Sequence, residues 1–321
     1  MIEKVKPIFY TSTLCKFLNI EDKTYSVWKV KTALFCPASK INLCLRQVSH
    51  QITNKEIASL KKFMTDPQYF HWPTSSVWAL AVRSKEVVMA RSTWYKYVGN
   101  FDLKRTKVSK KQKPKKKPLR AATKNQIWHA DVSVYTTLDN VKYYIYTVVD
   151  NFSRMILAWD IDTTLSASIR LRSIERAIKD QFDIELPGQS VDLIVDGGSE
   201  NNNHTIHDFI QNNRVNINKK IALKDIIQSN SMIEATYKIM KYRYFYAREI
   251  LSAAMRKEME FFVHDYNEVR PHNHHLYKTP YEVHYDIDPI DYKKIINQAI
   301  KERVVSNRQQ TCDLNCQLVK N

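Results

Sequence analysis

The sequence predicts an α/β protein in which a mixed five-stranded sheet flanked by helices follows a helical front part. Three observations indicate this class. Three strand-like segments follow one another in the middle of the chain, and helix-like and strand-like segments alternate after them. A long stretch then carries apolar residues at the three- and four-residue spacing that is typical of a helix. A run of basic residues with almost nothing apolar to bury separates this middle part from the front.

The 321 residues are enough for about two domains of ordinary size. We expect two small helix-turn-helix units, a linker, a sheet-bearing core and a tail. The predicted boundaries are 1–45, 46–103, 104–124, 125–285 and 286–321.

The net charge of +17, from 50 Lys+Arg and 33 Asp+Glu, is unevenly distributed. Residues 1–103 carry +8, the linker 104–124 carries +11 with no acid, the core 125–285 carries −3, and the tail carries +1. Such a division is typical of a protein that grips a polyanion with one part and does something else with another. The linker, with Lys104, Arg105, Lys115, Lys116 and Lys117, is predicted to follow phosphates. A solvated tether or a localisation signal is the alternative.

Several classes of protein are disfavoured. No apolar run approaches the ~18 residues of a membrane-spanning helix, and the first residues do not resemble a signal peptide. The cysteines form no CxxC pair and no ligand set with the histidines, which disfavours a disulfide scaffold and a zinc finger. These cysteines are Cys15, Cys36, Cys44, Cys312 and Cys316. We therefore expect a soluble protein of the prokaryotic cytoplasm, associated with the nucleoid and not with a membrane.

The front part contains two candidate helix-turn-helix units. Helices are expected at 11–18, 22–29, 53–63, 73–82 and 92–98. Thr53 and Glu56 have the spacing of a capping box that opens the third of these helices. The last helix is the expected recognition helix, with Arg91 and Lys96 as DNA contacts. Two such units before a basic linker favour DNA binding, although an ordinary helical bundle fits the same spacings.

Behind the linker, apolar, β-branched and aromatic residues predict strands, and apolar residues at helical spacing predict helices. The strands are expected at 127–135, 142–150, 154–161, 191–195 and 215–217. The helices are expected at 166–182, 204–212 and 231 to about 260, with one more at 292–304 in the tail.

Three carboxylates lie at informative places in this pattern. Asp131 is in the first strand, Asp196 directly follows the fourth strand, and Glu234 is in the first turn of the long helix. Acids at the carboxyl ends of strands point into the crevice where open α/β sheets place ligands. Together the three supply hard oxygen ligands that suit one or two Mg²⁺ ions, which would hold the reacting oxygens of a phosphoryl transfer in line.

Each carboxylate also has a simpler interpretation. Glu234 lies three residues after Ser231 and could complete a capping box. Asp196 could serve only the turn before Gly197 and Gly198, whose lack of a side chain would let the backbone turn sharply. Asp131 could be a solvent-facing strand residue. A bare cluster of three acids is nevertheless hard to explain by packing, because like charges repel.

The residues around the carboxylates resemble the catalytic core of the DDE transposases and retroviral integrases. The resemblance covers roughly residues 10–285. It is carried by the motifs WHAD (128–131), VDNFSR (149–154), DGGSEN (196–201) and SNSMIE (229–234). The segments YNEVRPH (266–272) and Thr279-Pro280 resemble the closing motif of bacterial insertion-sequence members of this group. A histidine-cysteine zinc domain like that of the viral enzymes is absent, so the resemblance is to the insertion-sequence branch.

This resemblance implies an RNase H-like fold and a transposase that cuts DNA and joins the exposed 3′-hydroxyl to a target with Mg²⁺ or Mn²⁺, as two ions. It implies that Asp131, Asp196 and Glu234 are the catalytic and metal-binding triad. Lys238 and Lys241 match positions that contact the bound DNA end. Arg270 and His272 match a motif whose role is DNA contact or local support. The implied partners are the terminal inverted repeats, target DNA and at least a second copy of the chain.

One spacing departs from the family. The 37 residues between Asp196 and Glu234 slightly exceed the usual number. We expect the loop around 219–228 to absorb the excess.

Two other functions remain open at the sequence level. One is a DNA-binding regulator that keeps the fold without catalysis. The other is an RNase H-like nuclease that cuts without joining.

Overall fold

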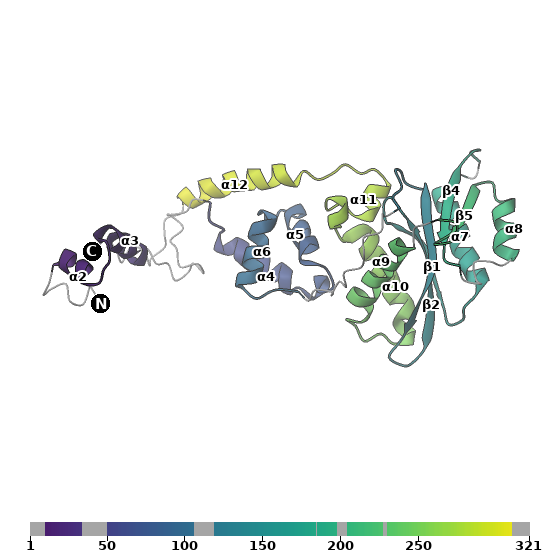
Figure 1. Cartoon of the computed structure of the whole chain (residues 1–321), viewed down its shortest axis with the longest axis horizontal. Coiled ribbons are helices and arrows are strands. Elements are labelled where there is room, and N and C mark those ends of the chain that lie inside the picture. Colours follow the sequence, from purple (N-terminus) through teal and green to yellow (C-terminus); the bar gives the residue numbers. More distant parts are fainter. Residues whose placement is uncertain are drawn as a thin grey trace. The chain divides into compact units, whose positions relative to one another are not determined.

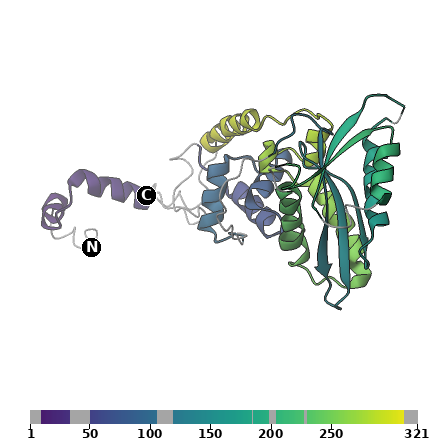
Figure 2. The ribbon, with the colours of Figure 1, turned by 45° about the vertical axis from the view of Figure 1, so that its right-hand side comes forward.

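The computed structural model describes residues 10–33, 50–105, 119–183, 185–197, 204–226 and 230–309 (Figures 1 and 2). The chain forms two compact units. The first, called the helical unit, comprises residues up to 63, residues 81–102 and residues from 291 onward. The second, called the sheet unit, comprises residues 64–80 and 103–290. Residues 64–80 thus group with the sheet rather than with the front helices that the sequence pattern assigned them to.

The sheet unit is built on the predicted mixed sheet, with strand order β3-β2-β1-β4-β5. The strands are β1 (Ile127–Thr136), β2 (Lys142–Asp150), β3 (Ile156–Asp162), β4 (Ser190–Val195) and β5 (Asn216–Ile221). The first three form an antiparallel meander, while β4 pairs parallel to β1 and β5 pairs parallel to β4. The five-stranded α/β fold expected from the sequence is therefore confirmed.

Helices cover both faces of this sheet (Figure 1). On one face, α7 (Ala167–Gln181) packs against a core that includes Trp128, Ala130 and Leu193, and α8 (His204–Asn212) packs beside α7. On the other face, α9 (Ser231–Ile239) and α10 (Met255–His264) join a core that includes Tyr135. Because side chains alternate along a strand, Asp131 faces α9 and not α7.

The prediction of one long helix from 231 to about 260 was wrong. After α9 the backbone widens into a π-helical turn, η4 (Met240–Phe245), and then leaves the helix. The chain reverses so that Ile250 enters the core and its carbonyl accepts a hydrogen bond from Leu138 N. Leu251, which in the sequence continues the helical spacing of Tyr237 and Tyr244, is exposed. Burial of Ile250 and Met255 therefore takes precedence over helix continuation.

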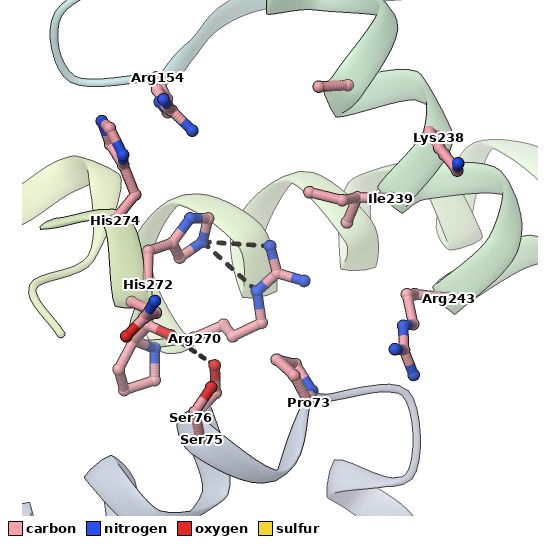
Figure 3. A pocket seen from close by; sticks show the side chains of 13 residues that line it. Pro73, Ser75, Ser76, Arg154, Lys238, Ile239, Arg243, Arg270, His272 and His274 are labelled. Atoms are coloured by element: carbon pink, nitrogen blue, oxygen red, sulfur yellow. Dashed lines mark hydrogen bonds between the residues drawn. The ribbon is translucent and has the colours of Figure 1, made fainter. Parts of the chain in front are cut away.

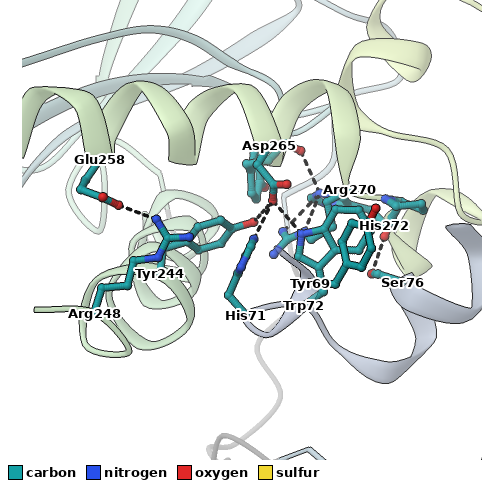
Figure 4. Close-up of polar contacts among 12 residues, drawn as sticks. Tyr69, His71, Trp72, Ser76, Tyr244, Arg248, Glu258, Asp265, Arg270 and His272 are labelled. Atoms are coloured by element: carbon teal, nitrogen blue, oxygen red, sulfur yellow. Dashed lines mark hydrogen bonds and ion pairs between the residues drawn. The ribbon is translucent and has the colours of Figure 1, made fainter. Parts of the chain in front are cut away.

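Residues 64–80 are fixed within the sheet unit by a buried carboxylate (Figure 4). Asp265 Oδ2 accepts hydrogen bonds from Trp72 Nε1 at 2.8 Å and from Tyr244 OH at 2.6 Å, and it lies 3.2 Å from His71 Nε2. Burial alone would raise the pKa of Asp265, but the bonds from His71, Tyr244 and Trp72 hold it below its ordinary value. A buried polar network that is satisfied in this way defines one arrangement of the segments that it joins.

The other elements of the sheet unit are short. They are η2 (Pro67–Tyr69), η5 (Ser252–Ala254), η6 (Asp265–Val269), η7 (Asn273–His275) and α11 (Pro280–His284). Helix α5 (Thr74–Arg83) begins in this unit.

The helical unit contains the predicted front helices other than α5, and one helix that comes from the tail. They are α2 (Thr11–Phe17), α3 (Asp22–Ala33), α4 (Asn54–Thr65), α6 (Arg91–Asn100) and α12 (Tyr292–Gln309). The predicted capping box is present, because Thr53 and Glu56 bond to each other's backbone N–H groups at 2.9 and 3.2 Å. None of the described helices is long and apolar enough to cross a membrane.

Helix α12 is anchored to the front helices by charged and polar contacts. The guanidinium of Arg303 forms an ion pair with Glu56 and donates to the Val88 carbonyl at 2.6 Å. Asn307 Nδ2 donates to the Gln51 carbonyl at 2.8 Å, and both Arg303 and Asn307 are buried. The predicted tail helix therefore completes the helical unit, a role that its sequence did not indicate.

We predict that Arg303→Gln destabilises the helical unit by about 3 kcal/mol, because it leaves Glu56 and the Val88 carbonyl without their buried partner. Urea denaturation followed by circular dichroism measures this loss. The exposed neighbour Lys301 provides a matched control, and Lys301→Gln is expected to change stability by less than about 0.5 kcal/mol. Equal stability of the two variants would contradict the anchoring role of Arg303.

Candidate active site

Two of the predicted carboxylates lie side by side because of strand register. β1 and β4 pair in parallel, with Ala130 opposite Val195. The next residues are Asp131, within β1, and Asp196, which directly follows the last residue of β4. The register therefore brings their backbones near each other, because paired strands lie about 4.8 Å apart. Both side chains are half-buried. The pair lies where β4 ends, which is the edge of the sheet that the sequence pattern indicated.

Helix α9 is held against this pair through a tyrosine. The hydroxyl of Tyr237 donates to the backbone carbonyl of Asp131 at 2.5 Å and accepts from Thr147 Oγ1 at 2.9 Å. Burial, and then the charge of Asp131, raise the pKa of Tyr237 well above its ordinary value. Tyr237 is therefore a neutral side chain that links α9 to the strand that carries Asp131.

The third carboxylate, Glu234, lies on α9 three residues before Tyr237. The capping box that was its simpler interpretation does not form, because the N-cap is Asn230 and no side chain caps this helix. The Glu234 side chain is exposed. Positions three apart share one face of a helix, so Glu234 is on the side of α9 that Tyr237 directs toward Asp131.

A buried histidine links the strand of Asp131 to the start of α9. His129 Nδ1 lies 2.7 Å from Asn230 Oδ1, and its Nε2 lies 2.8 Å from Asn151 Nδ2. The first bond requires a proton on Nδ1, and the second requires a free lone pair on Nε2, so the ring is neutral. Burial also lowers the pKa of His129. A small pocket of about 190 Å³ adjoins this network.

The predicted DNA contacts on and near α9 have different surroundings. Lys238 is exposed, whereas Lys241 is half-buried and interacts electrostatically with Asp131. Burial lowers the pKa of the Lys241 ammonium, and Asp131 partly offsets this effect. Lys241 is therefore a cation beside the carboxylate pair.

The closing motif is mostly buried. Arg270 is buried, stacks on the rings of Tyr244 and Tyr266, and contacts His272 Nε2 at 3.2–3.3 Å. His272 also lies 3.1 Å from the Tyr266 carbonyl. Of the two roles expected for this motif, these contacts favour local support.

The remaining predicted contacts lie outside the carboxylate site. The guanidinium of Arg105 donates to the carbonyls of Met64, Tyr69 and Trp72, and burial lowers its pKa to about 10. Both terminal nitrogens of this guanidinium are thus engaged within the protein. Lys104 is exposed, as are Arg91 and Lys96 on α6. Lys115, Lys116 and Lys117 lie outside the described residues.

The donor atoms at this site suit a hard divalent cation, since carboxylate oxygens are the ligands that Mg²⁺ prefers. Asp131 and Asp196 are adjacent by register, and Glu234 projects from the helix that packs over them. Within the described ranges, however, no three His, Cys, Asp or Glu side chains are close enough together to enclose an ion. The side chains are therefore of the chemical type that binds such a metal, and two of the three candidate ligands lie near each other.

A model of a known protein family matches part of this region. Residues 121–218 match the model of the integrase core domain. This match supports the resemblance of the sheet unit to the superfamily of DDE transposases and retroviral integrases. The match includes Asp131 and Asp196 and ends before Glu234. No curated protein matches the chain.

Solved structures of low sequence identity are also similar. The catalytic core of HTLV-2 integrase in complex with magnesium is 18% identical, with a TM-score of 0.40, over 51% of this chain and 99% of that chain. The intasome of simian T-cell lymphotropic virus in complex with a PP2A regulatory subunit is 17% identical, with a TM-score of 0.43, over 71% and 77%. The catalytic core of BIV integrase is 18% identical, with a TM-score of 0.37, over 50% and 95%.

Sequence reasoning gave no role to several residues that support the site. Asn151 and Asn230 were noted only as parts of motifs, and Tyr237 only as one of the apolar residues at helical spacing in the predicted long helix. The available signal was position, because each lies within a few residues of a predicted carboxylate or strand end. Their partners, such as His129, are distant in sequence and could not be paired without the fold.

We predict that the sheet unit loses stability as pH falls from 7 to 5, and that His129 contributes to this loss. The folded pKa of His129 lies below its ordinary value of about 6.5, so the unfolded chain binds the proton first as pH falls. Between these two pKa values, stability rises with pH by up to about 1.4 kcal/mol per pH unit for each such histidine. Urea denaturation at several pH values, followed by tryptophan fluorescence, measures the slope.

The variant His129→Gln retains a donor and an acceptor but does not titrate, and it is expected to reduce this slope. The same substitution at the exposed His50 serves as control and is expected to leave the slope unchanged. An unchanged slope in His129→Gln would show that this residue does not titrate on unfolding.

Proposed function

We propose that this protein is a DNA transposase of the insertion-sequence type, which binds the ends of its element and catalyses metal-dependent cleavage and strand transfer. The observation that carries the proposal is the register that sets Asp131 beside Asp196, within a segment that matches the integrase core domain. Glu234 supports it, since its predicted alternative as a capping residue does not apply.

The proposed chemistry is an in-line displacement at a DNA phosphate. Asp131, Asp196 and Glu234 would hold Mg²⁺ or Mn²⁺. When bound, two such ions would supply Lewis-acid stabilisation of the attacking and leaving oxygens. The chain's own contribution would be to position the carboxylates. The pairing of β1 with β4, which ends at Ala130 and Val195, supports a close placement of Asp131 and Asp196. The contact of Tyr237 with the Asp131 carbonyl supports an orientation of α9 that brings Glu234 toward them.

The proposed DNA contacts divide between the two units. Lys238 and Lys241 would meet the phosphates of the element end near the carboxylates, where Lys241 is already close to Asp131. Arg91 and Lys96 would contact the terminal repeat from α6, and Lys104 with the linker lysines would follow the backbone. We propose that the protein acts as at least a dimer, because two element ends are processed together, and that it works in the cytoplasm on nucleoid DNA.

The decisive test uses Asp131→Asn, Asp196→Asn and Glu234→Gln. Each substitution removes a negative oxygen ligand, so we expect strand cleavage and joining to fall by roughly a thousandfold or more, while binding of end DNA changes little. A labelled duplex that carries the terminal repeat, incubated with Mg²⁺ or Mn²⁺, measures both products on one gel. Isothermal titration of Mg²⁺ should show binding heat in the wild type that the triad variants lack.

Matched controls are available on the exposed face of α7. Asp180→Asn and Glu175→Gln make the same chemical changes outside the site and should leave both products unchanged. Cleaved products without joined strands would identify a nuclease. If the wild-type protein neither cuts nor joins DNA and Mg²⁺ produces no binding heat, the transposase proposal is wrong and a non-catalytic DNA-binding regulator is the remaining function.

A further inference from the structure

A large pocket in the sheet unit is mostly separate from the carboxylate site. It has a volume of about 880 Å³ and lies between α9 with η4, the turn between β2 and β3, the first turn of α5 and the segment after η6 (Figure 3). The charged and aromatic side chains that line it come from all these segments except α5. They are Arg154, Lys238, Arg243, Arg270, His272 and His274.

The pocket is strongly cationic. Four of its lining residues are Lys or Arg, and among the described residues that line it none is acidic. In the part of the chain that the structure describes, Arg154, Lys238 and Arg243 form no ion pair, and Arg270 is held by His272 and two aromatic rings. The first turn of α5, a ten-residue helix, adds the positive end of a helix dipole.

The titratable groups around the pocket respond to this excess of positive charge. Burial, and then the charge of Arg270, lower the pKa of Arg243. Burial and Arg270 also lower the pKa of His272, and burial with Arg154 lowers that of His274. Cations that repel one another in a partly buried site are stabilised when an anion binds among them.

Arg154 is placed for such a ligand by a rigid turn. Its backbone has a φ of 63°, in the left-handed region, and its N–H donates to the Asp150 carbonyl at 2.9 Å. The buried carboxylate of Asp150 accepts bonds from both Ser153 N and Ser153 Oγ at 2.7 Å, which fixes the turn. Among the described residues, the buried Nε of Arg154 has no hydrogen-bond partner. The Arg154 Nε–H is therefore positioned to donate a hydrogen bond to an acceptor atom of a bound ligand.

The size and the apolar part of the pocket restrict the ligand. A volume of this order is typical of sites for a single small molecule or a single nucleotide, and a base-paired duplex is far too large to enter. Pro73, Ala235 and Ile239 line the pocket together with the His272 ring, so a flat base has apolar and aromatic surface to contact. A cationic groove combined with such surface is the usual way to bind single-stranded nucleic acid.

We infer that this pocket holds an unpaired nucleotide of a DNA strand, with its phosphate among Arg154, Arg243 and Lys238 and its base against Pro73 and Ile239. The inference rests on the proposed function in that DNA is the substrate. It adds that part of the bound DNA is single-stranded, and that the unpaired strand lies in a pocket of its own beside α9.

Photocrosslinking of the full-length protein tests this inference without catalysis. The probe is a duplex with a short single-stranded thymidine overhang that carries one 4-thiothymidine, mixed with protein in the presence of a metal chelator. We expect crosslinks that mass spectrometry locates at residues 235–243 or 270–274. The double variant Arg154→Gln, Arg243→Gln should lower the yield by about tenfold or more, because it removes two charged donors.

The controls separate the possible outcomes. Arg214→Gln removes an exposed guanidinium far along the chain from the pocket and should leave the yield unchanged. Lys238→Gln, at an exposed position, provides a second test if the double variant unfolds at a lower temperature. An equal yield from a paired 4-thiothymidine, or crosslinks only elsewhere, would overturn the inference. Excess thymidine 5′-monophosphate should lower the yield, because it offers the pocket the same phosphate and base.

The same probe distinguishes this failure from failure of the proposed function. If the wild-type protein crosslinks at the pocket but neither cuts nor joins DNA, the inference about the pocket stands and the proposed transposase activity is wrong. If the protein cuts and joins DNA without these crosslinks, the proposed transposase activity stands and the inference about the pocket is wrong.

Discussion

The parallel pairing of β1 with β4 is the constraint on which the candidate site depends. These two strands are far apart in sequence, and only their hydrogen-bonded register sets Asp131 beside Asp196. A shift by one residue would turn one of the two carboxylates to the opposite face of the sheet, into the core beneath α7. The burial of Trp128 and Ala130 in that core opposes such a shift, because it would move both side chains out of this core to the face that carries α9. Apolar packing on one face therefore positions the charged groups on the other.

The sequence predicted the sheet and most helices because their signals are local. Strands such as 142–150 are continuous runs of β-branched and aromatic residues, and the capping box at Thr53 and Glu56 depends on a spacing of three. The helix from 231 was overextended because no Pro or Gly marks its end. It ends where Ile250 is drawn into the core, which depends on the β1–β2 hairpin. The grouping of α12 with α4 could not be predicted, since it is made by Arg303 and Glu56 across most of the chain.

The carboxylates of the candidate site could be predicted from the sequence, but the residues that hold them in place could not. Acids at strand ends can be read from sequence because the position of the strand end fixes where they point. His129 was noted in the sequence, but its function depends on two asparagines that follow it in the chain, one 22 residues later and the other 101 residues later. Two predicted DNA contacts, Arg105 and Arg270, have their guanidinium groups engaged within the protein. Composition indicates that a chain is basic, but burial decides which of its cations are available to a ligand.

The place of α12 in the helical unit has a consequence for the order in which the protein is made. The front helices are synthesised first, yet α4 lacks its buried ion-pair partner until residues 292–309 leave the ribosome. The sheet unit, which ends at residue 290, can fold before that point. During synthesis, a chain therefore has its carboxylate-bearing unit available before the unit proposed to recognise DNA is complete.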